Sequence, residues 1–158
     1  MVRWLATWFG SGLSPVAPGT AGSLAALPFA WLLAWAGGAW TLLGATVMVF
    51  GVGVVVSEAY RQTAGRKDPS EVVIDEVAGQ WLTLGLVLLV WPMDSLIVAL
   101  SFLAFRIADI TKPWPANAID RRMDGGLGIM LDDMVAGLYA AGAVLITLIG
   151  LRNGIVAS

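Results

Sequence analysis

The sequence predicts an all-α, polytopic helical membrane protein, with about four to five membrane-embedded helices and short interfacial or re-entrant segments. Its residues are 58% hydrophobic and only 13% charged, and the mean hydropathy is +0.82. A soluble domain usually has about 25% charged residues. Eight tryptophans in 158 residues fit side chains that lie at a membrane–water boundary. The length predicts a single domain that covers residues 1–158.

Five apolar segments follow one another along the chain, at residues 23–35, 40–56, 77–91, 95–105 and 134–151. The first is short and interrupted by Pro28, the second would span roughly 25 Å as a helix, and the last is the longest. Several fall short of the ~20 residues that a membrane crossing needs, so we expect tilted or re-entrant helices. Ahead of them, residues 1–12 predict a retained interfacial helix rather than a cleaved signal.

The charges gather on one side of these segments. If all five are membrane spans, residues 1–22, 57–76 and 106–133 lie on the same side. That side carries eight of the nine Lys and Arg residues and ten of the eleven acids. Loops rich in Lys and Arg face the cytoplasm. The sequence therefore predicts polar chemistry at the cytoplasmic face of the membrane.

The residue types narrow the chemistry. The chain has no Cys and no His, which excludes thiolate nucleophiles, phosphohistidine chemistry and ordinary zinc sites. A net charge of −2 argues against nucleic acid as a partner. Any reaction is left with carboxylates, Lys and Arg, and hydroxyls, with or without a hard metal ion.

Acidic residues stand at the edges of the apolar segments: Asp75, Glu76, Asp109, Asp120, Asp124, Asp132 and Asp133. Helix capping and solvated loop charge would account for single acids, Asp120 and Asp124 above all. They do not account for acid pairs, which repel each other and are partly desolvated at the membrane boundary unless a cation lies between them. Mg²⁺ suits such a place. The predicted Mg²⁺ ligands are Asp75, Glu76, Asp132 and Asp133, and the candidate catalytic residues are Asp75, Asp133 and Asp109.

Two short segments resemble each other: "DEVAG" (residues 75–79) and "DMVAG" (residues 133–137) each open an apolar run. In a helix the Asp and the Gly, four residues apart, share a face, and the small Ala and Gly side chains permit close helix contact. We therefore expect two acid-headed helices to meet at their cytoplasmic ends. An internal duplication and a chance match in an Ala-, Gly- and Val-rich chain both remain open.

Two further stretches suit a phosphate group. In "FRIADITKPWP", Arg106 and Asp109 share a face if the helix continues that far, and Lys112 follows. The alternative is a snorkelling Arg and a Lys that meets anionic headgroups. In "APGTAGS", glycines precede a helix start, where backbone N–H groups can cradle an anion; a Gly/Pro re-entrant turn is the structural alternative. The candidate phosphate-binding residues are Lys112, Arg106, Thr20, Gly19 and Ser23.

Four blocks together carry a family resemblance: "GSGLSPVAPGTAGSLAALP", "IDEVAGQW", "FRIADITKPWP" and "DGGLGIMLDDMVAG". In this order and spacing they resemble the phosphatidylglycerophosphatase A family, over about residues 10–142. Residues 59–70 match no motif. The motif positions that the resemblance carries, without fixing their roles, are Thr20, Asp75, Glu76, Asp109, Lys112, Asp132 and Asp133.

The resemblance implies an enzyme of the bacterial inner membrane with a cytoplasmic active site. It would hydrolyse phosphatidylglycerophosphate, with Mg²⁺, to phosphatidylglycerol and inorganic phosphate, and its partners would be this substrate and membrane lipids. Two routes fit a chain without Cys or His: attack by a metal-activated water, which we favour, and attack by an Asp carboxylate with a phospho-aspartate intermediate.

Two other classes fit the sequence less well. A phosphoalcohol transferase of lipid synthesis would need D-x-x-x-D after D-G-x-x-A-R, and "DGGLGIM" diverges from that pattern. A non-enzymatic lipid-binding or transport protein would need ionisable residues in the middle of the apolar runs, where the sequence has none. The spacing of Gly137 and Ala141 is compatible with a homo-oligomer as well as with packing inside one chain.

Overall fold

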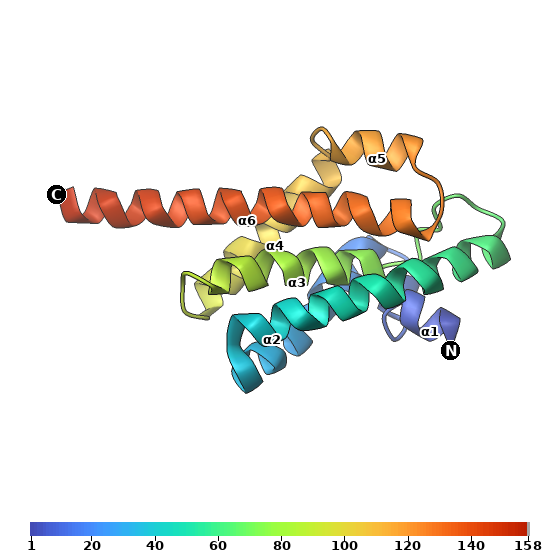
Figure 1. Cartoon of the computed structure of the whole chain (residues 1–158), viewed down its shortest axis with the longest axis horizontal. Helices are drawn as coiled ribbons and strands as arrows, with labels where there is room; N and C mark the ends of the chain where they lie inside the picture. The colour runs from blue at the N-terminus through green and yellow to red at the C-terminus, as the bar shows by residue number, and fades with distance from the viewer. Residues whose placement is uncertain (158) are drawn as a thin grey trace.

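The structure, a computed structural model, describes the backbone of residues 1–157 and the side chains of residues 1–153. Every regular element among these residues is a helix, as the sequence predicts (Figure 1). The elements are α1 (Val2–Ala6), η1 (Ser11–Leu13), α2 (Pro18–Ala64), α3 (Ile74–Leu88), α4 (Ser95–Thr111), α5 (Ala116–Arg122) and α6 (Gly126–Ala157).

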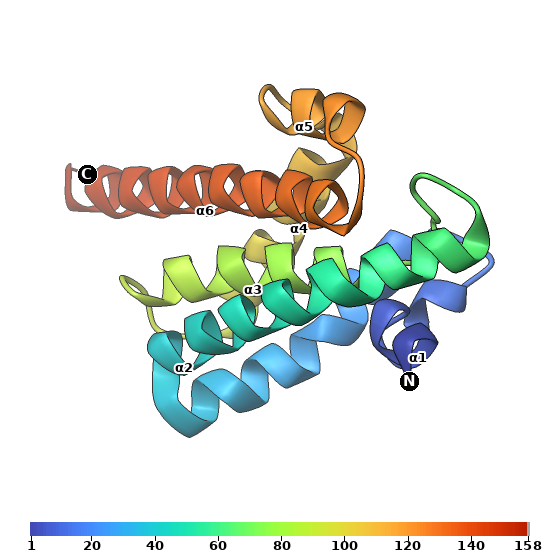
Figure 2. The same ribbon diagram turned by 45° about the vertical axis from the view of Figure 1, so that its right-hand side comes forward.

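Helix α2 is two arms joined by a reversal at a glycine pair. Gly37 has φ −161° and ψ 20°, and Gly38 has φ 71° and ψ −162°, neither of which is helical. The φ of Gly38 lies in the region that favours glycine, and Figures 1 and 2 show the chain turning back there. Pro28 lies inside the first arm and does not interrupt it, contrary to our expectation. Pro removes one backbone donor, a loss that membrane helices tolerate.

At their charged ends, several helices begin or end at residues other than those that hydropathy predicts. Helix α6 begins at Gly126 rather than at residue 134, so Asp132 and Asp133 lie inside it and not before it. Helix α3 begins at Ile74, which places Asp75 and Glu76 in its first turn. The segment after α4, expected as a loop, contains the short helix α5. Apolar runs mark where a helix is embedded, and the helix itself continues into polar sequence.

Helix α3 lies between α2 and α6 and packs on both (Figures 1 and 2). The α3–α6 contact confirms the predicted meeting of the two acid-headed helices. A Cβ added at Gly137 of α6 would lie 2.7 Å from the carbonyl oxygen of Gly79 on α3, so the backbones touch. The Thr83 hydroxyl donates to the carbonyl of Gly137 across the same contact, at 3.2 Å. On the other side, the indole of Trp81 donates to the Ala26 carbonyl of α2 at 2.9 Å.

Two helices are long and apolar enough to cross a membrane: Pro18–Ala64 and Gly126–Asn153. The outer surface carries large apolar side chains, among them Trp35, Trp40 and Ile146, which are exposed over 80%, 75% and 74% of their area. These findings support the predicted membrane character. The expected number of four to five membrane-embedded helices stays a prediction.

Candidate functional site

One end of the helix bundle encloses a cavity of about 380 Å³. It lies where α2, α3 and α6 begin and where α4 ends, so it collects the segments that the sequence places on one side of the membrane. Seven acids and three cations line it. They are Asp68, Asp75, Glu76, Asp109, Asp120, Asp132 and Asp133, with Lys67, Arg106 and Lys112.

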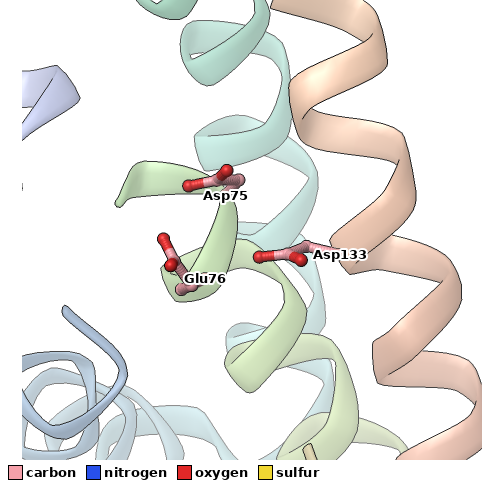
Figure 3. A group of neighbouring side chains, drawn as sticks. All are labelled: Asp75, Glu76 and Asp133. Atoms are coloured by element: carbon pink, nitrogen blue, oxygen red, sulfur yellow. The ribbon is translucent and has the colours of Figure 1, made fainter. Parts of the chain in front are cut away.

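Three of the acids form a cluster between α3 and α6, called the acid cluster below: Asp75, Glu76 and Asp133. Each offers a carboxylate oxygen, and these oxygens all lie within 4.8 Å of one another. Figure 3 shows the carboxylates facing a common space, two from the start of α3 and one from α6. Asp133 is 3% exposed. Asp75 and Glu76 are half-buried. Three carboxylates this close, with little water between them, repel one another and oppose ionisation.

The acid cluster suits a hard cation. One oxygen of each side chain is buried without a hydrogen-bond partner, namely Asp75 Oδ1, Glu76 Oε2 and Asp133 Oδ2. Buried polar atoms normally have partners, and orphaned ones need an explanation. Mg²⁺ prefers oxygen ligands, binds through few carboxylates and keeps waters. A bound Mg²⁺ would satisfy these oxygens and offset the repulsion among the three carboxylates.

Arg106 ties α4 to the start of α2. Its guanidinium forms an ion pair with Asp109 at 2.8 Å, with both side chains largely buried. It also donates to the Ser23 hydroxyl at 3.2 Å, and that hydroxyl donates to the carbonyl of Gly19 at 2.9 Å. The Nε atom of Arg106 is buried without a hydrogen-bond partner, so one donor of this guanidinium is unsatisfied.

Lys112 stands at the end of α4 between two carboxylates. Its Nζ lies 2.6 Å from Asp132 Oδ2 and 2.9 Å from Asp120 Oδ1. Burial disfavours the charged form, but the hydrogen bonds to Asp132 and Asp120 outweigh it and raise the pKa of Lys112. The lysine is therefore a permanent cation that links α4, α5 and α6 around the cavity.

Gly19 lies against the acid cluster in the first turn of α2. A Cβ at this position would overlap Oε1 of Glu76 and lie 3.2 Å from a guanidinium nitrogen of Arg106. Only glycine lets the two side chains come this close to the α2 backbone. Thr20, the next residue, lines the cavity. The positive end of the α2 dipole thus faces the acids and any anion bound beside them.

Glu58 holds the start of α6 on α2. Its carboxylate accepts a hydrogen bond from the backbone N–H of Gly126 at 2.8 Å. Arg61 binds the same carboxylate through two nitrogens, at 2.6 and 2.9 Å. A carboxylate at a helix N-terminus complements the dipole. Because α6 carries Asp133, this contact helps to set the position of the acid cluster.

The structure brings most of the predicted site residues together, with two differences in detail. Asp132 lines the cavity but its carboxylate binds Lys112 and lies outside the acid cluster. Ser23 is fully buried behind the cavity wall, where it orients Arg106 and Gly19. The other candidate residues all line the cavity: Asp75, Glu76, Asp109, Asp133, Lys112, Arg106, Thr20 and Gly19.

Sequence reasoning missed two acids of the cavity. Asp120, interpreted as a loop acid, is an ion-pair partner of Lys112. Asp68 lies in the stretch that matches no motif, and only its place in the cavity reveals it. Asp124 is a solvated loop residue, as expected. Its side chain is 73% exposed and forms an ion pair with Lys67 at 3.0 Å.

Comparison with known proteins gives a consistent result. The family model described as Phosphatidylglycerophosphatase A matches residues 4–148. The chain is 44% identical to the phosphatidylglycerophosphatase A of Escherichia coli over 139 residues, 87% of this chain and 78% of that protein. It is 34% identical to the phosphatidylglycerophosphatase A of Haemophilus influenzae, covering 88% and 83% of the two chains. A relative from Bacteroides thetaiotaomicron, 38% identical with 86% of each chain covered, is named provisionally as a phosphatidylinositol-3-phosphatase. No solved structure matches significantly.

Proposed function

The chain belongs to the phosphatidylglycerophosphatase A family, and from this membership we propose how its cavity works. The protein is a phosphatidylglycerophosphatase. It hydrolyses the terminal phosphate monoester of phosphatidylglycerophosphate and releases phosphatidylglycerol and inorganic phosphate. The match over residues 4–148 carries this conclusion, and it includes every residue of the cavity.

The acid cluster is the proposed Mg²⁺ site. Asp75, Glu76 and Asp133 would hold the ion, since their orphaned oxygens converge. Mg²⁺ bound there would offset charge on the phosphate and favour attack by water. Asp132 is connected to the site by its ion pair with Lys112, and Asp120 forms an ion pair with the same ammonium group. The role of Asp132 is then to place the lysine rather than to bind the ion directly.

Lys112 and Arg106 are the proposed phosphate-binding cations. Both line the same cavity as the acid cluster, and phosphate oxygens favour such donors. Gly19 and Thr20 add the positive end of α2. Asp109 orients the Arg106 guanidinium by its 2.8 Å ion pair, which makes Asp109 a positioning residue in this scheme.

Two nucleophiles fit this site. We prefer attack by a water that bound Mg²⁺ would activate, because the three carboxylates that lie closest to one another are the ones suited to binding the ion. In the alternative route, the carboxylate of Asp75 or Asp133 attacks phosphorus and a phospho-aspartate forms. Trapping of a phosphorylated enzyme would distinguish the second route from the first.

The cavity lies at the proposed cytoplasmic face of a multi-pass protein in the bacterial inner membrane. Support comes from the two helices that could cross a membrane and from the Lys and Arg residues around the cavity end. In this placement the acyl chains of the substrate stay in the bilayer beside the apolar helices. The headgroup reaches the acids at the membrane edge.

The test is phosphate release by the purified protein from phosphatidylglycerophosphate in detergent micelles. It is run with Mg²⁺, with a chelator, and with phosphatidic acid as a competing lipid. We expect Mg²⁺-dependent release that phosphatidic acid competes with poorly. Release that persists in the chelator would contradict the metal site while leaving the phosphatase activity standing, and no release with any metal would contradict both.

A further inference from the structure

The acids of the cavity differ in their partners. Three form the acid cluster, which suits a metal ion. Three others are ion-paired, Asp109 with Arg106 and both Asp120 and Asp132 with Lys112. Among the residues that the structure describes, Asp68 is the cavity acid that has neither a hydrogen bond nor an ion pair and stands outside the acid cluster.

Asp68 is placed by the loop between α2 and α3, residues 65–73. Its neighbour Lys67 anchors this loop to the segment before α6, through Asp124 at 3.0 Å and the carbonyl oxygen of Arg121 at 3.2 Å. With Lys67 turned to these partners, the Asp68 side chain lines the cavity at its mouth. The anchored loop therefore presents an acid to whatever the cavity holds.

The surroundings of Asp68 favour its protonated form. Although Asp68 is exposed at the cavity mouth, partial desolvation raises the pKa of Asp68, and Asp120 and Asp109 add to the effect against the opposing charges of Lys112 and Lys67. The ion-paired acids instead have a carboxylate oxygen engaged by Arg106 or Lys112.

We propose that Asp68 is a catalytic residue for this hydrolysis, the general acid that protonates the glycerol oxygen as it leaves phosphorus. Water or an enzyme carboxylate forms the new bond to phosphorus, and the bond from phosphorus to the glycerol oxygen breaks with its electron pair on that oxygen. The oxygen takes the Asp68 proton and becomes the hydroxyl of phosphatidylglycerol. On the water route the nucleophilic water releases a proton to solvent, and on the carboxylate route water then hydrolyses the phospho-aspartate to free the carboxylate and inorganic phosphate. Solvent reprotonates Asp68, and either route consumes one water.

The proposal rests on the phosphatase activity but not on the choice of nucleophile or on the metal ligands. An alkoxide is a poor leaving group near neutral pH, and general acids contribute roughly 100-fold to 10,000-fold in rate. A thiolate leaves without a proton. Replacing the bridging oxygen of the substrate by sulfur therefore removes the need for the acid and leaves the shape of the substrate almost unchanged.

The test compares Asp68→Asn with the unaltered protein on the oxygen substrate and on this bridging-sulfur analogue. We expect Asp68→Asn to lower turnover of the oxygen substrate at least ~100-fold and to leave turnover of the sulfur analogue nearly unchanged. Glu71→Gln is the matched control, because Glu71 is an acid of the same loop that pairs with Arg66 and does not line the cavity. It should behave like the unaltered protein on both substrates.

A binding measurement accompanies the kinetics. The non-cleavable methylene phosphonate analogue of the substrate should bind Asp68→Asn with unchanged Kd, because the acid acts on the leaving oxygen and not on the phosphate. Equal loss on the oxygen and sulfur substrates would overturn the proposal and make Asp68 a binding or folding residue. Full activity of Asp68→Asn on the oxygen substrate would overturn it as well.

Discussion

Asp133 is 3% exposed, and one of its carboxylate oxygens has no hydrogen-bond partner. Its position beside Asp75 and Glu76 costs stability when no cation is bound, because like charges are crowded where water is scarce. A residue kept at such a cost is expected at a functional site. The stability and the activity of the protein should therefore respond in opposite directions when this charge is removed.

Replacing Asp133 by Asn tests this trade-off. Turnover of phosphatidylglycerophosphate should fall at least ~100-fold, while the unfolding temperature measured without divalent cations should rise. Phosphate release and thermal unfolding in detergent measure the two effects. An active variant, or one that unfolds earlier than the unaltered protein, would contradict the metal-site proposal for this residue.

Gly19 provides a second test at the scale of one residue. In Gly19→Ala the new Cβ would overlap Oε1 of Glu76, so the carboxylate must shift from its place in the acid cluster. We expect a marked loss of turnover with more Mg²⁺ needed for half-maximal rate. Gly44→Ala is the control, because a Cβ there meets nothing within 4 Å. It should keep full activity and gain about 0.5–1 kcal/mol of helix stability. Similar behaviour of the two variants would contradict the close approach of Glu76.

At the scale of elements, the contact between α3 and α6 sets the distance between the acids. Asp75 and Glu76 begin α3, and Asp133 lies one turn before Gly137 on the same face of α6. Gly137 and Gly79 let these backbones touch. The geometry of the acid cluster thus depends on small residues one turn deeper in the bundle.

Gly137→Ala should separate the two helices. The Cβ would lie 2.7 Å from the Gly79 carbonyl oxygen and 3.3 Å from the Thr83 hydroxyl, and such overpacking costs about 1–3 kcal/mol. Unfolding temperature and turnover should both fall. Gly142→Ala, on the same helix with nothing within 4 Å of the new Cβ, should keep full turnover and should not lower the unfolding temperature. Unaltered stability of Gly137→Ala would show that the helices can separate without cost.

The start of α6 gives a second test at this scale. Glu58→Ala removes the acceptor of the Gly126 N–H and should loosen the turns that precede Asp133, lowering both turnover and unfolding temperature. The matched control is Glu71→Ala, since Glu71 also binds an arginine through both oxygens, at 2.7 and 2.8 Å from Arg66. If both variants lose the same turnover, the contact with α6 is not what matters.

At the scale of the molecule, Mg²⁺ binding should stabilise the whole fold. The acid cluster joins α3 to α6, so an ion bound there favours the folded protein over the unfolded one by mass action. A concentration 100 times Kd gives about 2.7 kcal/mol. We expect the unfolding temperature to rise with Mg²⁺ concentration in the unaltered protein and not in Asp133→Asn. An equal rise in both would place the ion elsewhere.

Local sequence was enough to predict the helical membrane class, the apolar segments, the charged side and the motif acids. Each of these depends on local composition or on spacing along one helix, which the residues carry with them. The resemblance carried by the four blocks, from "GSGLSPVAPGTAGSLAALP" to "DGGLGIMLDDMVAG", added the substrate, and the comparisons confirmed it.

Which acids lie around the same cation depends on how the helices pack. Asp132 and Asp133 are adjacent in sequence, yet in a helix neighbouring side chains point about 100° apart. One therefore binds Lys112 and the other faces Asp75 and Glu76. Asp68 lies in a stretch without any motif and lines the cavity because the α2–α3 loop returns to it. Distances between side chains on different helices depend on packing across the bundle, and no pattern along a single segment contains them.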